Sequence, residues 1–331
     1  MSAKELSAEP YIKGILQGDV VLLSKAITLV ESTLEEHREL SAQVLEGLQE
    51  YTGNSFRLGI TGVPGVGKSS FIEVFGKRLV EQGHKVAVLA IDPSSSKSKG
   101  SILGDKTRMN ELSTHPSVYI RPSPSSGSLG GLTRHTYESM LLCEAAGYDF
   151  ILIETVGVGQ SETAVSGISD FFLLLMLAGA GDELQGIKRG IMEMADALVI
   201  TKADGDNLTK AKAARSEYAH AMHLFQAEES GWIPKTMICS SVSGEGMQDI
   251  LSMLSDYKNK TTQSGYFAEK RKQQQFKLFE QALDEEVLRS FRKNEAVKNS
   301  IDEVLQLSKS SKVQPFVMAR KIAALFLNTE K

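Results

Sequence analysis

The chain has 331 residues, of which 41% are hydrophobic and 24% are charged, and its formal net charge is −4. This composition is typical of globular proteins and excludes collagen-like and largely disordered chains. A negative net charge without a long Lys/Arg block argues against a nucleic-acid partner, because phosphate neutralisation needs a basic surface. The length exceeds the common single-domain size, so we expect one large core with helical additions, or two domains.

Compartment signals are few. The first residues lack the apolar region of a secretory signal, and the longest apolar run, residues 171–180, is shorter than the ~20 helical residues that span a bilayer. The two cysteines, Cys143 and Cys239, stand at no paired spacing, which suits a reducing compartment. We therefore expect a cytoplasmic protein with no membrane partner.

Residues 1–53 are expected to form an N-terminal helical segment. Apolar residues recur at helical spacing from Tyr11 to Tyr51, and the pattern is broken at Gly18-Asp19. From residue 54 to 262, apolar runs alternate with helix-length stretches, which predicts an α/β domain whose mostly parallel sheet is covered on both faces. The predicted strands are Arg57–Thr61, Val86–Ile91, Val118–Arg121, Phe150–Glu154, Phe171–Met176, Ala197–Thr201 and Thr236–Ser240.

A phosphate-binding loop follows the first predicted strand. Residues 59–71 read GITGVPGVGKSSF and match GxxxxGK[ST], with a strand before the match and a helical pattern after it. In this context backbone N–H groups and the helix N-terminus surround the phosphates of a nucleotide. Lys68 is expected to reach the β/γ-phosphates and Ser69 to bind Mg²⁺. The predicted nucleotide-binding residues of the loop are Gly62, Val63, Pro64, Gly65, Val66, Gly67, Lys68, Ser69 and Ser70.

Two later strands end in carboxylates, at the edge of a parallel sheet where ligands bind. Asp92 follows the second strand and is a candidate for the Mg²⁺ or water network. Glu154 ends the fourth strand and Gly157 follows it, in the form of a Walker-B strand leading into a switch: the carboxylate holds Mg²⁺ or its water, and the glycine N–H can bond a γ-phosphate. Gln160 is a candidate for orienting the attacking water.

The sixth predicted strand runs into Lys202-Ala203-Asp204, which resembles the guanine-reading [NT]KxD element of GTPases. A carboxylate at Asp204 can accept hydrogen bonds from guanine N1–H and the 2-amino group, which adenine lacks, while the Lys202 stem covers the base. Thr201 stands where most GTPases have Asn, and its hydroxyl cannot reproduce an amide's paired donor and acceptor, so weaker guanine affinity is expected. Ser240 and Ser241 fit the loop that touches the base from the other side.

Two further segments carry chemical signals. His220 and His223 lie one helical turn apart and could bind a metal, but no cysteine or third ligand follows at suitable spacing. Residues 263–331 form an expected C-terminal helical arm. Its apolar faces have no sheet to cover, which favours either a dimer interface or packing on the N-terminal helices.

Six blocks together resemble the MeaB/ArgK/MMAA family of GTPases, over about residues 26–254: GVPGVGKSS, AIDPSSS, GSILGDKTRM, RPSPSSGSLGG, ETVGVGQSE and AGAGDELQGIKRGI. The resemblance implies a GTP- and Mg²⁺-dependent chaperone, usually dimeric, for an adenosylcobalamin-dependent acyl-CoA mutase, typically methylmalonyl-CoA mutase. The cobalamin would belong to the partner. GTP hydrolysis would gate cofactor loading, and hydrolysis by the isolated protein is expected to be slow.

Carried onto this chain, the resemblance implies a magnesium-proximal group of Ser69, Asp92, Asp105 and Glu154. It also implies a third switch over Gly179–Lys188 that signals to the mutase, with Gln185 and Lys188 as its active members. Which group polarises the attacking water stays open among Gln160, Gln185, Lys188 and Arg108.

Three other functions compete with this one. Older naming in the same family suggests an ATP-using kinase linked to basic amino-acid transport, against which Asp204 argues. A scaffold in which nucleotide only stabilises a dimer is a second alternative. A nickel-type metallochaperone GTPase is a third, and the lack of a Cys/His cluster in the sequence counts against it.

Overall fold

The computed structural model describes residues 7–92, 109, 111–124, 129–155, 161–179, 189–222, 230–310 and 313–329. The chain divides into two compact units, Met1–Lys272 and Gln273–Lys331. The boundary between them lies within helix α11, which spans Tyr266–Lys293.

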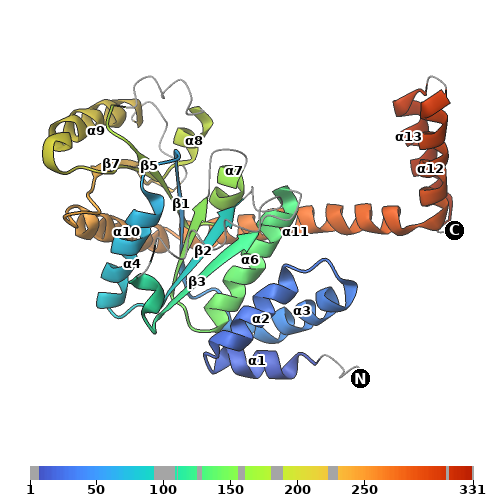
Figure 1. Ribbon diagram of the computed structural model, residues 1–331, viewed down its shortest axis with the longest axis horizontal. Coiled ribbons are helices and arrows are strands. Elements are labelled where there is room, and N and C mark those ends of the chain that lie inside the picture. The colour runs from blue at the N-terminus through green and yellow to red at the C-terminus, as the bar shows by residue number, and fades with distance from the viewer. Residues whose placement is uncertain are drawn as a thin grey trace. The chain divides into compact units, whose positions relative to one another are not determined.

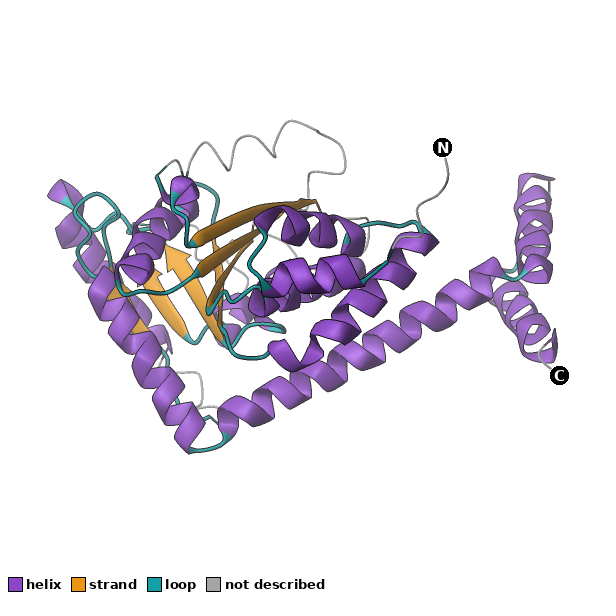
Figure 2. Ribbon diagram, turned by 90° about the horizontal axis from the view of Figure 1, so that it is seen from below, coloured by secondary structure: helices purple, strands orange, loops and turns teal. Residues whose placement is uncertain are grey.

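A seven-stranded sheet with the order β3-β2-β4-β1-β5-β6-β7 forms the centre of the first unit (Figures 1 and 2). All six pairings between the described strands are parallel, so the predicted α/β architecture is confirmed. The strands are β1 (Phe56–Gly62), β2 (Val86–Asp92), β3 (Val118–Pro124), β4 (Phe150–Thr155), β5 (Phe171–Met176), β6 (Ala197–Ile200) and β7 (Lys235–Ile238).

The last strand ends earlier than the sequence predicts. It stops at Ile238 instead of Ser240, because Ser240 already belongs to a turn in which its N–H donates to Glu245 O (3.0 Å) and its carbonyl accepts from Gly244 N (3.0 Å).

Helices cover both faces of the sheet. Strand β5 contributes side chains to both faces: Leu173 and Leu175 belong to the apolar core on one face, and Leu174 and Met176 belong to the core on the other. Since neighbouring strand residues point to opposite faces, a continuous apolar run is required here. One face is covered by α4 (Lys68–Glu81) and α10 (Met247–Gln263), and the other by α6 (Leu129–Ala145), α7 (Ser161–Ser166), α8 (Arg189–Met194) and α9 (Leu208–Met222); η2 (Leu112–Thr114) and η4 (Gly205–Asn207) are short 3-10 turns.

Helices precede the sheet as predicted, and α2 and α3 pack on α6 (Figure 1). The predicted break at Gly18-Asp19 is present, since Gly18 has a φ of 76° and the Asp19 carboxylate caps the next helix through Val21 N (2.8 Å) and Leu22 N (3.0 Å). A second break after Val30 was not predicted. The helices that precede the sheet are α1 (Glu9–Leu16), α2 (Val20–Val30), α3 (Glu35–Leu48) and the short 3-10 turn η1 (Gln49–Tyr51).

A buried charge network holds the amino ends of β1 and β5. Arg57 of β1 donates to Glu144 of α6 through Nε (2.8 Å) and Nη2 (3.1 Å), and its backbone N–H donates to Asp170 (2.8 Å). Arg271 of α11 donates to both carboxylate oxygens of Asp170, and Lys270 donates to the carbonyl of Asp170 (2.8 Å). Four elements that are separated in sequence, β1, α6, β5 and α11, are therefore joined at the edge opposite the P-loop.

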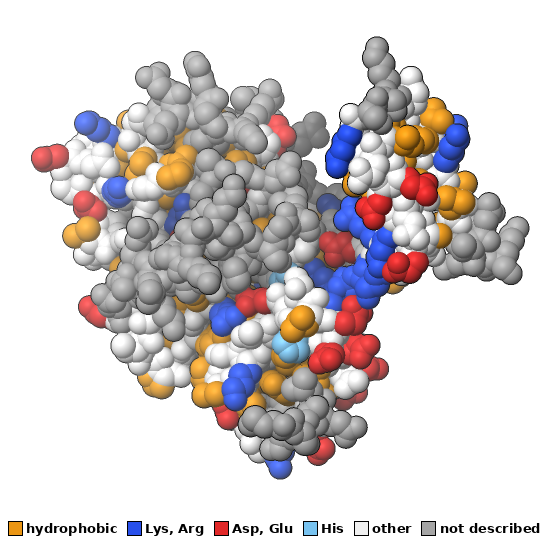
Figure 3. All heavy atoms as spheres, turned by 45° about the vertical axis from the view of Figure 1, so that its right-hand side comes forward, with side chains coloured by type: hydrophobic (Ala, Val, Ile, Leu, Met, Phe, Trp, Pro, Cys, Tyr) orange, Lys and Arg blue, Asp and Glu red, His pale blue; other side chains and the backbone are white. Residues whose placement is uncertain are grey.

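The second unit contains the rest of α11 with α12 (Glu295–Ser310) and α13 (Pro315–Thr329). The Phe291 and Phe326 rings pack edge-on with centroids 5.3 Å apart. Hydrophobic side chains also lie at the surface of these helices (Figure 3), including Phe316, Val317, Leu325 and Leu327. Within the described part of the chain, no helix combines the length and apolar character that crossing a membrane requires.

Candidate functional site

The predicted P-loop connects the central strand β1 to α4. Gly67 adopts the left-handed conformation (φ 95°) at the N-cap of α4 and provides no side-chain cap. A Cβ on Gly62 would lie 2.4 Å from the carbonyl oxygen of Leu175 on the neighbouring strand, so only glycine fits there. The first-turn N–H groups of α4, which have no intrahelical acceptors, are consequently available for an anion.

Lys68 opens α4 and is only 8% exposed. Its Nζ donates to Gly62 O (2.7 Å) and lies 3.4 Å from Val63 O, so the side chain folds back over the loop. Burial lowers the pKa of the Lys68 ammonium below its ordinary value, and the charges of Glu154 and Glu162 partly oppose this shift. A poorly solvated cation at the loop suits phosphate binding.

Two of the predicted magnesium ligands meet. Ser69 Oγ donates to Glu154 Oε1 at 3.3 Å, with Glu154 buried at the carboxyl end of β4 beside β1. Adjacent ligands of an octahedral Mg²⁺, each ~2.1 Å from the ion, lie about 3 Å apart. The hydroxyl and carboxylate oxygens therefore fit a magnesium ion by both spacing and chemistry.

The predicted base-reading residues also come together. Ser240 Oγ accepts the N–H groups of Val242 and Ser243, both at 3.1 Å, which leaves its proton for Asp204 Oδ2, its hydrogen-bond partner. The Asp204 carboxylate is thereby held in one orientation by a buried hydroxyl. Ser241, the residue after Ser240, is half-buried.

Thr201 and Lys202, which follow β6, contact the P-loop. Lys202 has a positive φ of 56°, and its Nζ donates to Gly65 O (2.9 Å). The Thr201 hydroxyl is buried and lies 2.6 Å from Val66 O. The Thr201 side chain is thus directed to the phosphate-binding loop, and the weaker guanine affinity predicted from the sequence stays a prediction.

Several predicted residues lie outside the described part of the chain. They are Asp105, Gly157, Gln160, Gln185, Lys188, Arg108 and His223, together with the side chain of Asp92, whose backbone ends β2.

Sequence reasoning missed Glu162, in the first turn of α7. Its side chain is almost fully buried, and its charge acts on Lys68. The ETVGVGQSE block ends at this residue, but the block by itself predicts no role for it, because its burial depends on the packing of α7 against β1 and β4.

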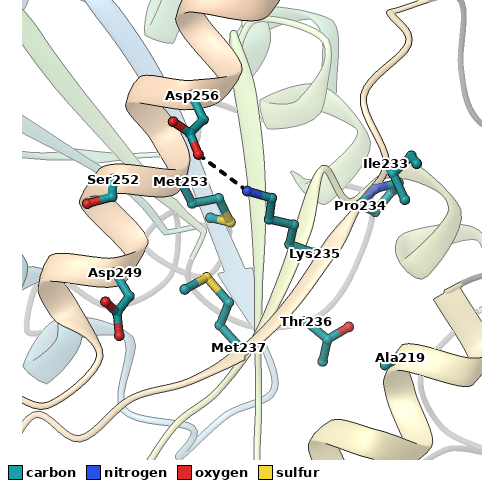
Figure 4. A pocket seen from close by; sticks show the side chains of 10 residues that line it. All are labelled: Ala219, Ile233, Pro234, Lys235, Thr236, Met237, Asp249, Ser252, Met253 and Asp256. Carbon is teal, nitrogen blue, oxygen red and sulfur yellow. Dashed lines mark hydrogen bonds and ion pairs between the residues drawn. The ribbon is translucent and has the colours of Figure 1, made fainter.

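A pocket of about 500 Å³ lies along the edge strand β7, between α9 and α10 (Figure 4). Lys235 Nζ stands 3.5 Å from Asp256 Oδ2 there, and Met237 and Met253 lie beside them. None of the predicted nucleotide-binding residues lines this pocket. Among the described residues, no group of three or more His, Cys, Asp or Glu side chains could hold a metal ion.

Comparisons with known proteins identify the family of this chain. The family profile described as "Methylmalonyl Co-A mutase-associated GTPase MeaB" matches residues 23–296. The chain belongs to the MeaB family. A GTPase of this family is expected to hydrolyse GTP, for which the P-loop provides the phosphate site.

Relatives of this MeaB-family chain carry several names. It is 45% identical to "GTPase ArgK" of Escherichia coli (strain K12) over 326 residues, covering 98% of both chains. It is 48% identical to "Methylmalonic aciduria type A homolog, mitochondrial" of Mus musculus over 298 residues, covering 87% of this chain and 72% of the relative. A solved structure, "Crystal structure of LAO/AO transport system kinase", is 38% identical and has a TM-score of 0.76, and the match covers 99% of this chain and 100% of that one.

Proposed function

We propose that this protein is a Mg²⁺-dependent GTPase that acts as a chaperone for an adenosylcobalamin-dependent acyl-CoA mutase, with methylmalonyl-CoA mutase as the foremost candidate. The observation that carries the proposal is the meeting of Lys68, Ser69 and Glu154 at the P-loop in a chain that matches a mutase-associated GTPase family. The names of the mitochondrial relatives support the same client.

Each side chain has a role in this proposal. The N–H groups of Gly67–Ser70, at the end of the loop and the start of α4, and the Lys68 ammonium bind the β- and γ-phosphates. Ser69 and Glu154, with Asp92 and Asp105, hold Mg²⁺, which neutralises phosphate charge when bound. Asp204, oriented by Ser240, selects guanine, with Lys202 and Ser241 beside the base. Gly157 meets the γ-phosphate, and Gln160, Gln185 and Lys188 are candidates for orienting the attacking water.

Turnover is proposed to be slow in the isolated protein and faster with the mutase, because a partner that binds one switch state better shifts the balance between the two states. The cobalamin would be held by the mutase. GTP hydrolysis would then time cofactor loading of the mutase and its protection.

Phosphate release from GTP and from ATP, with Mg²⁺ and with or without purified methylmalonyl-CoA mutase, tests the proposal. GTP turnover accelerated by the mutase is expected. Lys68→Ala should abolish turnover, whereas Lys77→Ala, on the same helix but paired at the surface with Glu73 and Glu111, should retain it. Equal turnover by Lys68→Ala and the wild type would contradict the proposed site.

We also propose a homodimer formed through the C-terminal arm, residues 263–331. Support comes from the hydrophobic side chains that α11 and α13 leave at the surface of the second unit, such as Phe276, Phe279 and Phe316. Sedimentation of the full-length chain should give twice the monomer mass, and Phe279→Glu combined with Phe316→Glu should lower it. A monomeric wild type at micromolar concentration would exclude this assembly.

The solved relative is named a transport system kinase, and this name supports a second candidate: an ATP-using kinase linked to basic amino-acid transport. The two functions differ in the base they require. Competition between ATP and GTP for the wild-type protein separates them, because a carboxylate at Asp204 pairs with guanine donors that adenine lacks. A preference for ATP would favour the kinase.

A further inference from the structure

The loop that follows β6 makes two adjacent contacts with the phosphate-binding loop. Thr201 Oγ1 donates to the carbonyl of Val66 at 2.6 Å, and Lys202 Nζ donates to the carbonyl of Gly65 at 2.9 Å. Thr201 is only 2% exposed. Because the site is buried, water cannot readily replace this short hydrogen bond if the hydroxyl is removed.

The geometry fixes which acceptor the Thr201 hydroxyl uses. Its single proton has two carbonyls within reach, Val66 O at 2.6 Å and Met176 O at 3.2 Å. Met176 O already accepts the backbone N–H of Thr201 at 2.9 Å. The shorter bond to Val66 is therefore the one that the hydroxyl makes, and this donor is unavailable to a nucleotide base.

Pinning the Val66 carbonyl orients one particular N–H group. The Val66–Gly67 peptide is planar and trans, so its N–H points away from its carbonyl and hence away from Thr201. That N–H belongs to Gly67, whose position before the first turn of α4 leaves it outside the helical hydrogen bonds. The preceding N–H, of Val66, is instead used within the loop by Val63 O at 3.2 Å.

We propose that Thr201 is a positioning residue for phosphate binding: it holds the Val66–Gly67 peptide so that the Gly67 N–H faces the phosphates. Its contribution to nucleotide affinity passes through the phosphates and not through guanine. This inference rests on the proposed nucleotide site, and it gives Thr201 a task different from base recognition.

Binding of three ligands with Mg²⁺ tests the assignment: GDP, IDP, which lacks the 2-amino group, and inorganic pyrophosphate, which lacks the base. Competition against a fluorescent GDP analogue gives each affinity. Thr201→Val keeps the shape and removes the hydroxyl. This variant should lower the affinity for each of the three ligands by a similar factor, about tenfold, because one buried hydrogen bond is lost. Thr201→Ser, which keeps the donor, should bind close to wild type.

Thr261→Val is the matched control. Thr261 is also fully buried and donates to a backbone carbonyl, Tyr257 O at 2.7 Å, but it lies on α10 and outside the site. This variant should leave all three affinities unchanged. Should Thr201→Val fail to fold, Thr201→Ala is measured with the same ligands.

The outcomes separate this inference from the proposed function. Unchanged affinity for pyrophosphate in the Thr201 variants, or a loss confined to GDP, would overturn the phosphate role. A wild type that binds pyrophosphate but does not prefer GDP to ADP would contradict the guanine-specific function, while the pyrophosphate comparison would still decide the role of Thr201.

Discussion

Arg271 donates two parallel hydrogen bonds to the carboxylate of Asp170, Nε to Oδ1 and Nη2 to Oδ2, each 2.7 Å long. The Asp170 side chain is 1% exposed and that of Arg271 is 14% exposed. Asp170 also accepts the backbone N–H of Arg57. This bidentate pair therefore joins the first turns of α11 to the amino ends of β1 and β5, and it lies where water cannot replace a lost partner.

Arg271→Met should lower the free energy of unfolding by about 3–5 kcal/mol, because it leaves the Asp170 carboxylate buried without its cation. Chemical denaturation of the full-length chain measures the change. Lys272→Met is the control, since the neighbouring Lys272 is 74% exposed and stands 3.9 Å from Glu269; its loss should change stability by less than about 0.5 kcal/mol. Equal effects of the two substitutions would contradict the structural importance of the pair.

The pKa of Glu144 predicts a loss of stability in acid. Burial by itself raises this pKa, but the charge of Arg57 and hydrogen bonds from Arg57, Ser55 and Gly53 outweigh burial, so the pKa lies below its ordinary value near 4.5. Between the two values the unfolded chain binds more protons than the folded one. The Glu144 contribution is therefore complete above about pH 4.5 and disappears as the pH falls through the folded pKa.

Glu144→Gln should be less stable than wild type at pH 7, because buried Arg57 loses its ion-pair partner, and its stability should fall less steeply below pH 4.5. Denaturation midpoints at several pH values measure both effects. Glu81→Gln, which removes a surface carboxylate that is 62% exposed, should reproduce the wild-type profile. An acid profile of Glu144→Gln identical to that of wild type would disprove the assignment.

Gly246 and Gly265 allow backbone strain and steric collision to be separated. Both have a φ of 79°, but a Cβ at Gly246 would lie 2.2 Å from Ile238 O, whereas at Gly265 it would meet nothing within 4 Å. Gly265→Ala should cost about 1–2 kcal/mol from the left-handed backbone alone. Gly246→Ala should destabilise more, since backbone must shift at the start of α10. Thermal unfolding of the two variants should place Gly246→Ala clearly lower.

Ser240→Ala should reduce the preference for guanine by about five- to tenfold, because the Asp204 carboxylate loses the hydroxyl that orients it. The ratio of GDP to ADP affinity measures this. Ser243→Ala removes a hydroxyl of the same loop that accepts a hydrogen bond from Glu245 N at 3.3 Å, and should leave the ratio unchanged. A Ser240→Ala protein with an undiminished ratio would show that Asp204 needs no such support.

Local patterns in the sequence were sufficient for the parallel sheet. Each apolar run in β1, β2, β4 and β5 is long enough to be buried on both faces, and each is followed by a helix-length stretch. The sequence placed two element boundaries wrongly: the end of β7 and the break after Val30. β7 stops at Ile238 because Ser240 is committed to a turn, and the break after Val30 separates two helices that pack on α6.

The sequence by itself determined the class of site, because a P-loop, a strand ending in Glu154 and the Lys202-x-Asp204 element are local patterns whose chemistry depends on spacing. It could not assign Thr201, whose acceptor Val66 lies 135 residues away in the chain, nor Glu162, whose burial beside Lys68 requires α7 to be packed. Contacts of this kind arise only when separate strand ends meet at one edge of the sheet. Tertiary structure therefore decided what each of these side chains touches.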